Sequence, residues 1–197
     1  MKITEYRGIE GLVYAKVIED STEIFKTDEV KELAGTSELT RSTDSSSETH
    51  FYDNMPAVVI ESTGADEVTA NVSAIPLEVL ADITGQYYDA TTGMFVEGAR
   101  QNNYYAMGYR TKKTDGTEVL VWRLKGTFSI PESTHNTEDD GTDANGQEIT
   151  YTGISTTHKF TKTGKGAKAI NVEASNKVDT SAFFNTVQTP DTIEVKP

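Results

Sequence analysis

Residues 104–131, YYAMGYRTKKTDGTEVLVWRLKGTFSIP, predict a β-hairpin that supplies half of a core sheet. Two runs rich in aromatic and β-branched residues flank Asp115-Gly116, a dipeptide typical of two-residue type I′ turns because both positions need φ > 0. A turn of this length decides which residues of the two strands face each other. The expected pairs are Tyr105–Gly126, Met107–Leu124, Tyr109–Trp122, Thr111–Leu120 and Lys113–Glu118.

This register predicts one apolar and one more polar face for the hairpin. The apolar face carries six large side chains: Tyr105, Met107, Tyr109, Leu120, Trp122 and Leu124. The other face carries small or polar residues for the most part: Ala106, Gly108, Arg110, Val121, Arg123 and Lys125. A shift of one residue would scatter the apolar set over both faces, so we expect the register to be fixed and the apolar face to be buried.

Three further segments are expected to be strands. Residues 11–18, GLVYAKVI, are apolar at nearly every position, which is typical of a strand covered on both faces. Residues 23–33 are a weaker candidate, and residues 149–160 are the third. Together with the hairpin, these segments indicate a β-rich domain.

The middle of the chain is expected to contain an exposed part and a second hairpin. Residues 39–48, LTRSTDSSSE, are polar and serine-rich, so they predict a loop or an exposed hairpin arm. Residues 53–56, DNMP, indicate a turn. Residues 57–60 and 66–74 then predict two paired strands joined by a turn at residues 62–65.

Residues 76–84, PLEVLADIT, are the best helix candidate. Pro76 stands where helices begin, Glu78 lies in the first turn, and Gly85 follows where a C′ glycine belongs. So short a helix is marginal alone, so it must pack on a sheet.

These elements predict a mainly β fold of two packed sheets, a sandwich or barrel, with one flanking short α-helix. Residues 1–10 are expected to be an N-terminal arm. Residues 11–185 are expected to form a single β-rich domain, and residues 186–197 a C-terminal tail.

Composition excludes several classes of protein. The chain has 197 residues and no cysteine, which excludes thiol chemistry and removes any need for an oxidising compartment. We find no signal peptide and no apolar run near the ~20 residues of a membrane helix, so we expect folding in a cytoplasm and no membrane partner. A net charge of −13 argues against tight binding of nucleic acid. The alternative interpretation is that this charge simply keeps the protein soluble.

No catalytic, cofactor-binding or metal-binding signature is found, so we predict no catalytic residue, no cofactor and no metal. His50, His135 and His158 lie far apart in unrelated contexts and belong to no HExxH spacing. The sequence has no G-x-S-x-G elbow, no P-loop and no dinucleotide fingerprint.

The acidic segment at residues 132–148 is the one candidate for a cation site. It holds six acids and no Lys or Arg, but neither EF-hand register places carboxylates at positions one and twelve. A looser Ca²⁺ site formed by Asp139, Asp140 and Asp143 is an alternative to a solvated loop.

Residues 159–168 hold four lysines and no acid. Copies packed head to tail could pair this tract with the acidic segment, and such heterologous contacts build rings or filaments. Replacing Lys162, Lys165 and Lys168 by Glu would then prevent assembly. The alternative is two independent solvated segments.

Trp122, Tyr105 and Tyr109 suggest a second alternative, a sugar-stacking platform on a carbohydrate-binding or adhesive β-sandwich. The predicted face of these aromatic residues also carries Leu120, Leu124 and Met107. These apolar neighbours favour a core role for the three aromatic residues instead.

Four blocks of the chain resemble the major tail protein family of long-tailed bacteriophages and prophages of Gram-positive bacteria, the phi-thirteen type. These blocks are GLVYAKV at residues 11–17, LEVLADITG at 77–85, YAMGYRTK at 105–112 and VWRLKGTFSIPE at 121–132. Their order and spacing fit this family across residues 8–184.

The resemblance implies a non-enzymatic structural virion protein, the tail-tube subunit of a siphovirus. Members of the family are β-sandwiches with a flanking helix and a long projecting loop, and inner strands of neighbouring subunits join into one barrel. They assemble in the bacterial cytoplasm into rings, typically hexameric, that stack into a tube through which DNA leaves the capsid. The implied partners are sister copies and the tape-measure, tail-terminator and distal tail proteins; DNA passes without specific binding.

The acidic balance of the chain agrees with such a channel wall, because a negative wall repels phosphate. We therefore expect some of the acids to line the lumen. A lumen dominated by Lys and Arg would contradict this expectation.

Overall fold

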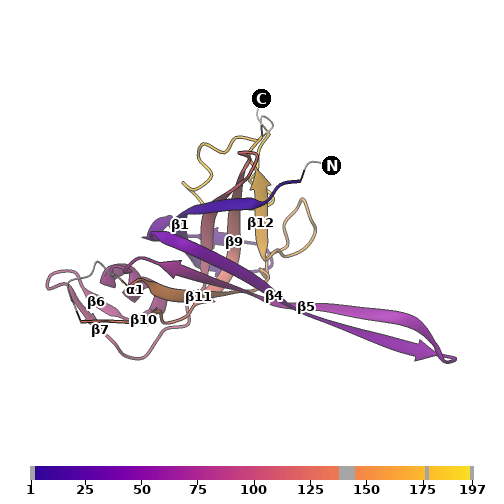
Figure 1. Cartoon of the computed structure of the whole chain (residues 1–197), viewed down its shortest axis with the longest axis horizontal. Helices are drawn as coiled ribbons and strands as arrows, with labels where there is room; N and C mark the ends of the chain where they lie inside the picture. Colours follow the sequence, from indigo (N-terminus) through magenta and orange to yellow (C-terminus); the bar gives the residue numbers. More distant parts are fainter. Residues whose placement is uncertain (1–2, 138–144, 176–177, 196–197) are drawn as a thin grey trace.

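The computed structural model describes residues 3–137, 145–175 and 178–195. Within them the fold is mainly β, with one ten-stranded sheet, a separate two-stranded sheet and one short helix (Figure 1). The strands are β1 Tyr6–Asp20, β2 Phe25–Thr27, β3 Lys31–Ala34, β4 Thr36–Tyr52, β5 Met55–Val72, β6 Tyr87–Asp89, β7 Met94–Val96, β8 Tyr105–Lys113, β9 Glu118–Phe128, β10 Glu132–Ser133, β11 Gln147–Gly153 and β12 Ala169–Glu173; the helix is α1 Leu77–Thr84.

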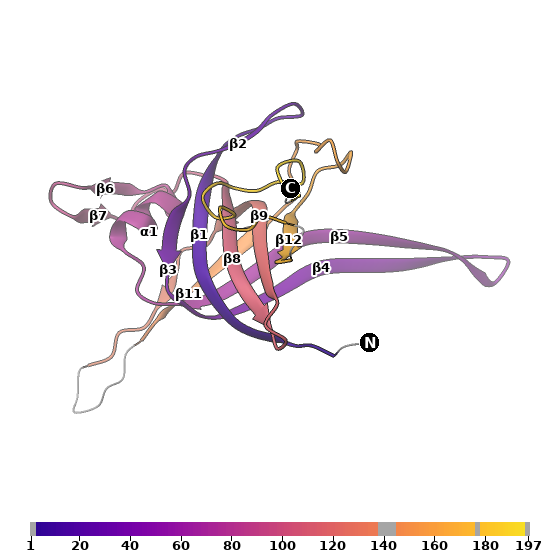
Figure 2. The same ribbon diagram turned by 90° about the horizontal axis from the view of Figure 1, so that it is seen from above.

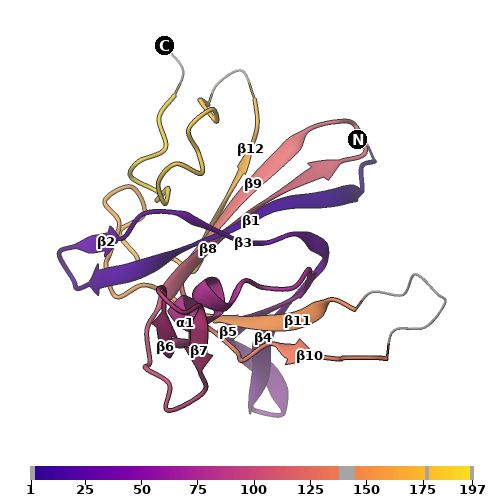
Figure 3. The ribbon, with the colours of Figure 1, turned by 90° about the vertical axis from the view of Figure 1, so that its left-hand side faces the viewer.

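The large sheet divides along β9. Its main path runs β2-β1-β8-β9-β11-β5-β4, and every pairing is antiparallel. Residues 119–123 of β9 pair with β12, whereas residues 126–128 pair with β11. The strands beyond this division fold over as a second layer, and Figure 3 shows β10 and β11 beneath β1, β8 and β9. The prediction of packed sheets with one flanking helix is confirmed.

Aromatic residues fill the core between the two layers. Tyr14 and Tyr105 meet edge to face at 6.1 Å, and Phe128 meets Tyr151 in the same way at 5.1 Å. The helix contributes Ile83. Such pairs add about 0.5–1.5 kcal/mol each beyond the area they bury.

The opposite face of β8 and β9 forms a second core under the C-terminal segment. Trp122 is completely buried, and its indole N–H donates to the carbonyl oxygen of Phe183 at 3.0 Å. Leu120, Leu124 and Phe160 pack around it. Both faces of the hairpin are therefore buried, whereas the sequence predicted one.

The predicted register of the hairpin is wrong over most of its length. The N–H of Lys113 donates to the carbonyl oxygen of Thr117, so the loop has three residues rather than two. Gly116 has a φ of 88°, while Asp115 does not adopt the positive φ that a type I′ turn needs. Its carboxylate instead accepts a hydrogen bond from the N–H of Thr117.

The longer loop moves every pair by one residue up to a bulge between Tyr105 and Met107. Tyr105–Gly126 forms as predicted, but the other pairs are Met107–Arg123, Gly108–Trp122, Tyr109–Val121, Arg110–Leu120, Thr111–Val119 and Lys112–Glu118. Leu120, Trp122 and Leu124 consequently face away from Tyr105, Met107 and Tyr109. Lys113 forms its ion pair with Glu173 instead of Glu118.

The predicted second hairpin is also wrong, because β5 continues without a turn through residues 62–65. The turn lies at Asp53 and Asn54, whose φ angles of 50° and 62° are those of a type I′ turn. It joins β4 to β5 in one long hairpin that projects from the body (Figure 2). The serine-rich segment therefore lies in an exposed hairpin arm, one of the two predicted outcomes.

The helix forms as predicted. Gly85 adopts the left-handed conformation at φ 67°, and the backbone N–H groups there reach Ala81 and Asp82. Asp82 fastens the helix to the sheet, since it accepts a hydrogen bond from the hydroxyl of Tyr14 and pairs with Lys31, both at 2.9 Å. Burial, and then the charge of Asp82, raises the pKa of Tyr14, so this phenol stays a proton donor.

Both predicted domain boundaries need correction. Tyr6–Glu10, part of the expected N-terminal arm, belongs to β1 and pairs with β8. In the expected C-terminal tail, Val187 is buried and Asp191 accepts hydrogen bonds from the backbone of Thr161 and Lys162. No helix in the described residues is long and apolar enough to cross a membrane.

Gly126→Ala is expected to destabilise the fold by about 2 kcal/mol or more, because overpacking a dense core forces its neighbours to move. A Cβ at this position would collide with the carbonyl oxygen of Thr152 and the ring of Tyr151. Gly98→Ala is the matched control, since nothing lies within 4 Å of its Cβ position. Urea unfolding followed by circular dichroism measures both variants. Equal midpoints would contradict the close packing of β9 on β11.

Candidate interaction surface

The outer part of the β4–β5 hairpin, residues 44–65, leaves the body and is called the arm below. Its two strands pair with each other from Ser45 and Thr63 out to Tyr52 and Met55. At about 3.3 Å per residue, this pairing gives an arm roughly 30 Å long. Figures 1 and 2 show it extending well clear of the other strands.

Apolar side chains concentrate at the outer end of the arm. Phe51, Tyr52 and Met55 are 64%, 65% and 65% exposed, and Val58, Val59 and Ile60 continue the run along β5. Because neighbouring residues of a strand point to opposite faces, this run makes both faces of the arm apolar. Contiguous apolar surface of this kind marks an interaction site.

A buried ion pair fixes the root of the arm. The guanidinium of Arg123 in β9 lies 2.6 Å from the carboxylate of Asp66 in β5, and both side chains are almost completely buried. Thr43 of β4 donates its hydroxyl to the same carboxylate at 3.0 Å. Lys168 lies 3.6 Å from Asp66 and donates to the carbonyl oxygen of Gly64. The point where the arm leaves the body is thus held from three other segments.

The environment of Asp66 keeps it ionised. Burial alone would raise its pKa, but the hydrogen bond from Thr43 and the charge of Arg123 outweigh burial and lower the pKa below its ordinary 3.8. The Nε atom of Arg123 is buried without a hydrogen-bond partner among the described residues. The carboxylate of Asp66 is therefore the main compensation for a charge that has lost its water.

An open cleft of ≈ 730 Å³ lies beside this root and is called the root cleft below. Its apolar lining comes from Ile9, Leu39, Tyr109, Val119 and Val121. Arg7 and Arg41 are exposed members of the lining, and Arg123 lies at its buried side.

Glycines in β1 help to shape the cleft. Gly8 and Gly11 have φ angles of 82° and 67°, and each lies at a bulge in the pairing of β1 with β8. A bulge bends its strand, and glycine is the residue that adopts a positive φ without strain. The bend lets the N-terminal half of β1 form one wall of the root cleft.

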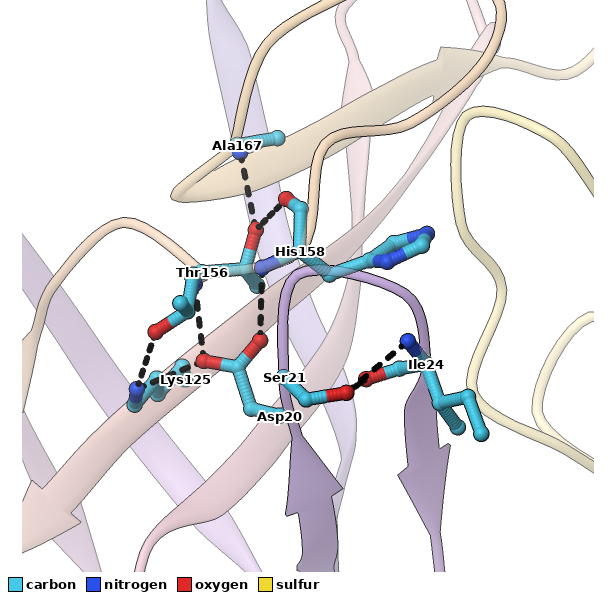
Figure 4. A network of polar contacts seen from close by, with 8 residues as sticks. Asp20, Ser21, Ile24, Lys125, Thr156, His158 and Ala167 are labelled. Carbon is cyan, nitrogen blue, oxygen red and sulfur yellow. Dashed lines mark hydrogen bonds and ion pairs between the residues drawn. The ribbon is translucent and has the colours of Figure 1, made fainter.

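A second polar network joins β1 to the segment after β11. Asp20 accepts hydrogen bonds from the N–H groups of Thr157 and His158 and pairs with Lys125 at 2.6 Å (Figure 4). Burial would raise the pKa of Asp20, but the hydrogen bonds from Lys125 and these N–H groups lower it. The network holds the segment after β11 against the sheet. These contacts of Asp20 are all made to other residues of the same chain, so they indicate a structural role.

The structure does not bring the three histidines together. His50 lies on the arm, His135 lies beside α1 in another hollow, and the ring of His158 packs on Phe160 at 5.0 Å. In the described part of the chain, no group of three or more His, Asp or Glu residues could hold a metal ion. The loose Ca²⁺ site at Asp139, Asp140 and Asp143, which was the alternative to a solvated loop, lies outside the described residues.

The aromatic platform, which was the alternative to a core role, does not form, and the core role favoured by the sequence is confirmed. Trp122, Tyr105 and Tyr109 are buried and divided between the two cores. Part of the lysine tract is used within the chain, because Lys162 donates to the carbonyl oxygen of Ile193 and Lys168 pairs with Asp66. Lys159, Lys162 and Lys165 are exposed, and the head-to-tail charge hypothesis for residues 159–168 stays a prediction.

Sequence reasoning missed the apolar arm tip and the Arg123–Asp66 pair. The tip had a signal in the sequence, since Phe51-Tyr52 and Val58-Val59-Ile60 flank the predicted turn.

No protein-family model matches this chain, and no curated protein matches it either.

Asp66→Asn is expected to cost about 3–5 kcal/mol of stability at pH 7, because it leaves the buried Arg123 without a counter-charge. Asp44→Asn, on the exposed part of the same hairpin, is the matched control and is expected to change stability by less than about 0.5 kcal/mol. Urea unfolding measures both changes. Similar effects of the two substitutions would contradict the role given to the buried pair.

The stability difference between the native chain and Asp66→Asn is expected to shrink in acid. The pKa of Asp66 is lower in the folded chain, so the unfolded chain takes up the proton first as the pH falls. The contribution of Asp66 is complete above its unfolded pKa of 3.8 and is lost as the pH falls through its folded pKa. Unfolding curves of both proteins between pH 7 and acid test this; a difference that stays constant would refute it.

Proposed function

We propose that this protein is a non-enzymatic structural subunit that assembles with copies of itself into stacked rings, forming the tail tube of a long-tailed bacteriophage. The observation that carries this proposal is the arm, a rigidly rooted hairpin whose apolar end its own chain leaves exposed. An isolated two-stranded hairpin is marginally stable in water. An arm of this length and composition therefore needs a partner surface.

The edges of the sheet favour association between copies. Within the described residues β4 pairs with β5 alone, so its other edge carries free backbone donors and acceptors along much of its 17 residues. Such edges accept further strands. Register shifts at Thr36, Thr43 and His50 make the pairing of β4 with β5 irregular, and such irregularities limit unspecific growth at the edge. These properties support joining of sister strands in a defined arrangement.

The proposed tube keeps the features of the family that the sequence resembles. Rings, typically hexameric, stack in the bacterial cytoplasm around the tape-measure protein, between the tail-terminator and distal tail proteins. DNA passes through the lumen without specific binding, and some of the acids line that lumen. The net charge of −13 supports a wall that repels phosphate. The virion tail is the proposed location.

No observation favours the second candidate, a carbohydrate-binding or adhesive module. Its sequence support was an aromatic platform, and these rings lie in the cores.

Concentrated protein is expected to form rings or tubes in negative-stain electron microscopy, and Phe51→Ser/Tyr52→Ser/Met55→Ser is expected to abolish them. These residues lie at the exposed end of the arm, so the substitutions leave the core intact. Ile18→Ser/Ile24→Ser/Met94→Ser is the matched control, because it removes exposed apolar residues away from the arm. Native protein that sediments as a monomer at every concentration, or assembly unaffected by the arm substitutions, would contradict the proposal.

A further inference from the structure

The arm tip, residues 51–55, and the root cleft have complementary surfaces. The tip presents the exposed side chains of Phe51, Tyr52 and Met55. The cleft offers an open, partly apolar hollow of ≈ 730 Å³. The tip exposes its apolar groups to water, whereas the cleft exposes apolar surface chiefly through the half-buried Ile9 and Leu39, because Tyr109, Val119 and Val121 belong to the core. Both surfaces lose their exposure to water if one covers the other.

We propose that the root cleft of each molecule receives the arm tip of a second copy of this chain. This inference rests on the proposed function, since it names the surfaces through which the copies associate. Phe51, Tyr52 and Met55 enter the hollow, where they contact the half-buried side chains of Ile9 and Leu39. Aromatic residues that fill a pocket are the usual anchors of an interface.

The arm tip cannot occupy the cleft of its own molecule. The ladder between β4 and β5 continues to Tyr52 and Met55, and the arm extends away from the body (Figure 2). Its root is held by Asp66 and Arg123, and the tip lies roughly 30 Å away at 3.3 Å per residue. A second molecule is therefore the available receptor.

Charge favours this pairing of surfaces. Asp53 stands exposed at the turn of the tip, between Phe51-Tyr52 and Met55. The cleft exposes Arg7 and Arg41, while Arg123 is already neutralised by Asp66. In a chain of net charge −13, a hollow lined by arginines selects an acidic partner, and the tip carries both the acid and the apolar anchors.

The other apolar hollow of comparable size is less suitable. It has a volume of ≈ 550 Å³ and lies beside α1, with Leu77, Leu80, Phe95 and Ile130 in its lining. Among the described residues, the charged residue in its lining is Glu97, and no arginine lines it. A tip that carries Asp53 would meet a like charge there.

The contact uses two different surfaces of the same molecule, one at each end of the arm. Such a contact is heterologous unless two molecules exchange arms reciprocally. A heterologous contact leaves one tip and one cleft free at the ends, so it continues into a ring or a filament. A reciprocal exchange closes at a dimer.

Cross-linking between single-cysteine variants tests the contact, because the native chain has no cysteine. Met55→Cys marks the tip, and Ser37→Cys marks the cleft with a nearly isosteric change at an exposed residue. Ile130→Cys marks the hollow beside α1, and Thr22→Cys marks an unrelated exposed turn. Each of these three is mixed with Met55→Cys and treated with a short bis-maleimide. We expect the mixture with Ser37→Cys to give about tenfold more heterodimer than either control.

Charge variants add a second measurement. Arg41→Glu is expected to weaken self-association about three- to tenfold at low ionic strength, and less in high salt, where screening is stronger. Lys26→Glu is the matched reversal on an exposed residue that lies outside the cleft and outside the lysine tract. Sedimentation at two salt concentrations measures both variants.

The outcomes separate this proposal from the proposed function. Rings or tubes that cross-link equally at Ser37→Cys, Ile130→Cys and Thr22→Cys overturn the docking site and leave the tube function standing. Preferential cross-linking through Ile130→Cys also overturns it. Preferential cross-linking through Ser37→Cys in particles that stop at dimers supports the docking site and contradicts the tube. Failure of the native protein to self-associate contradicts both.

Discussion

Arg123 and Asp66 lie side by side, almost without water, where the second layer folds back over the first and where the arm begins. A charge so deeply buried is costly unless it is paired. The ion pair between Arg123 and Asp66 therefore constrains the position of β5 relative to β9. Thr43 of β4 donates to the same carboxylate, and this bond sets the neighbouring strand as well. The direction of the arm follows from this point, because both of its strands are fixed there.

The arm and the body are stabilised in different ways. The body has two apolar cores, one on each face of the β8–β9 hairpin, and each is closed by distant segments of the chain. The arm beyond its root has cross-strand hydrogen bonds and no core. The body is therefore able to fold alone, while the outer arm gains most of its stability from whatever covers it.

Local signals in the sequence predicted the local features of the fold. Pro76, Glu78 and Gly85 defined the helix, because each acts within one turn of its end. The turn at Asp53 and Asn54 was equally local, but the glycine at residue 64 resembled a second turn, although β5 continues through it with only a register shift against β4. The register of the central hairpin was wrong because Asp115-Gly116 suits loops of two or three residues. With both faces buried, apolar patterning could not decide between them. The pairing of Arg123 with Asp66 joins residues far apart in the chain, so no local sequence pattern predicts this ion pair.

The division of β9 among three partners has a consequence for biosynthesis. Its neighbours β8, β11 and β12 lie on both sides of it in the chain, and β12 ends at Glu173. A ribosome has to complete most of the polypeptide before this strand can satisfy all its backbone groups. Contacts so distant in sequence make folding slow, because the closure of long loops precedes any gain from pairing. The hairpin of β4 and β5 emerges from the ribosome much earlier. The nascent chain therefore exposes the apolar arm tip while the later strands are still being translated. A chaperone at the tunnel exit would bind this segment.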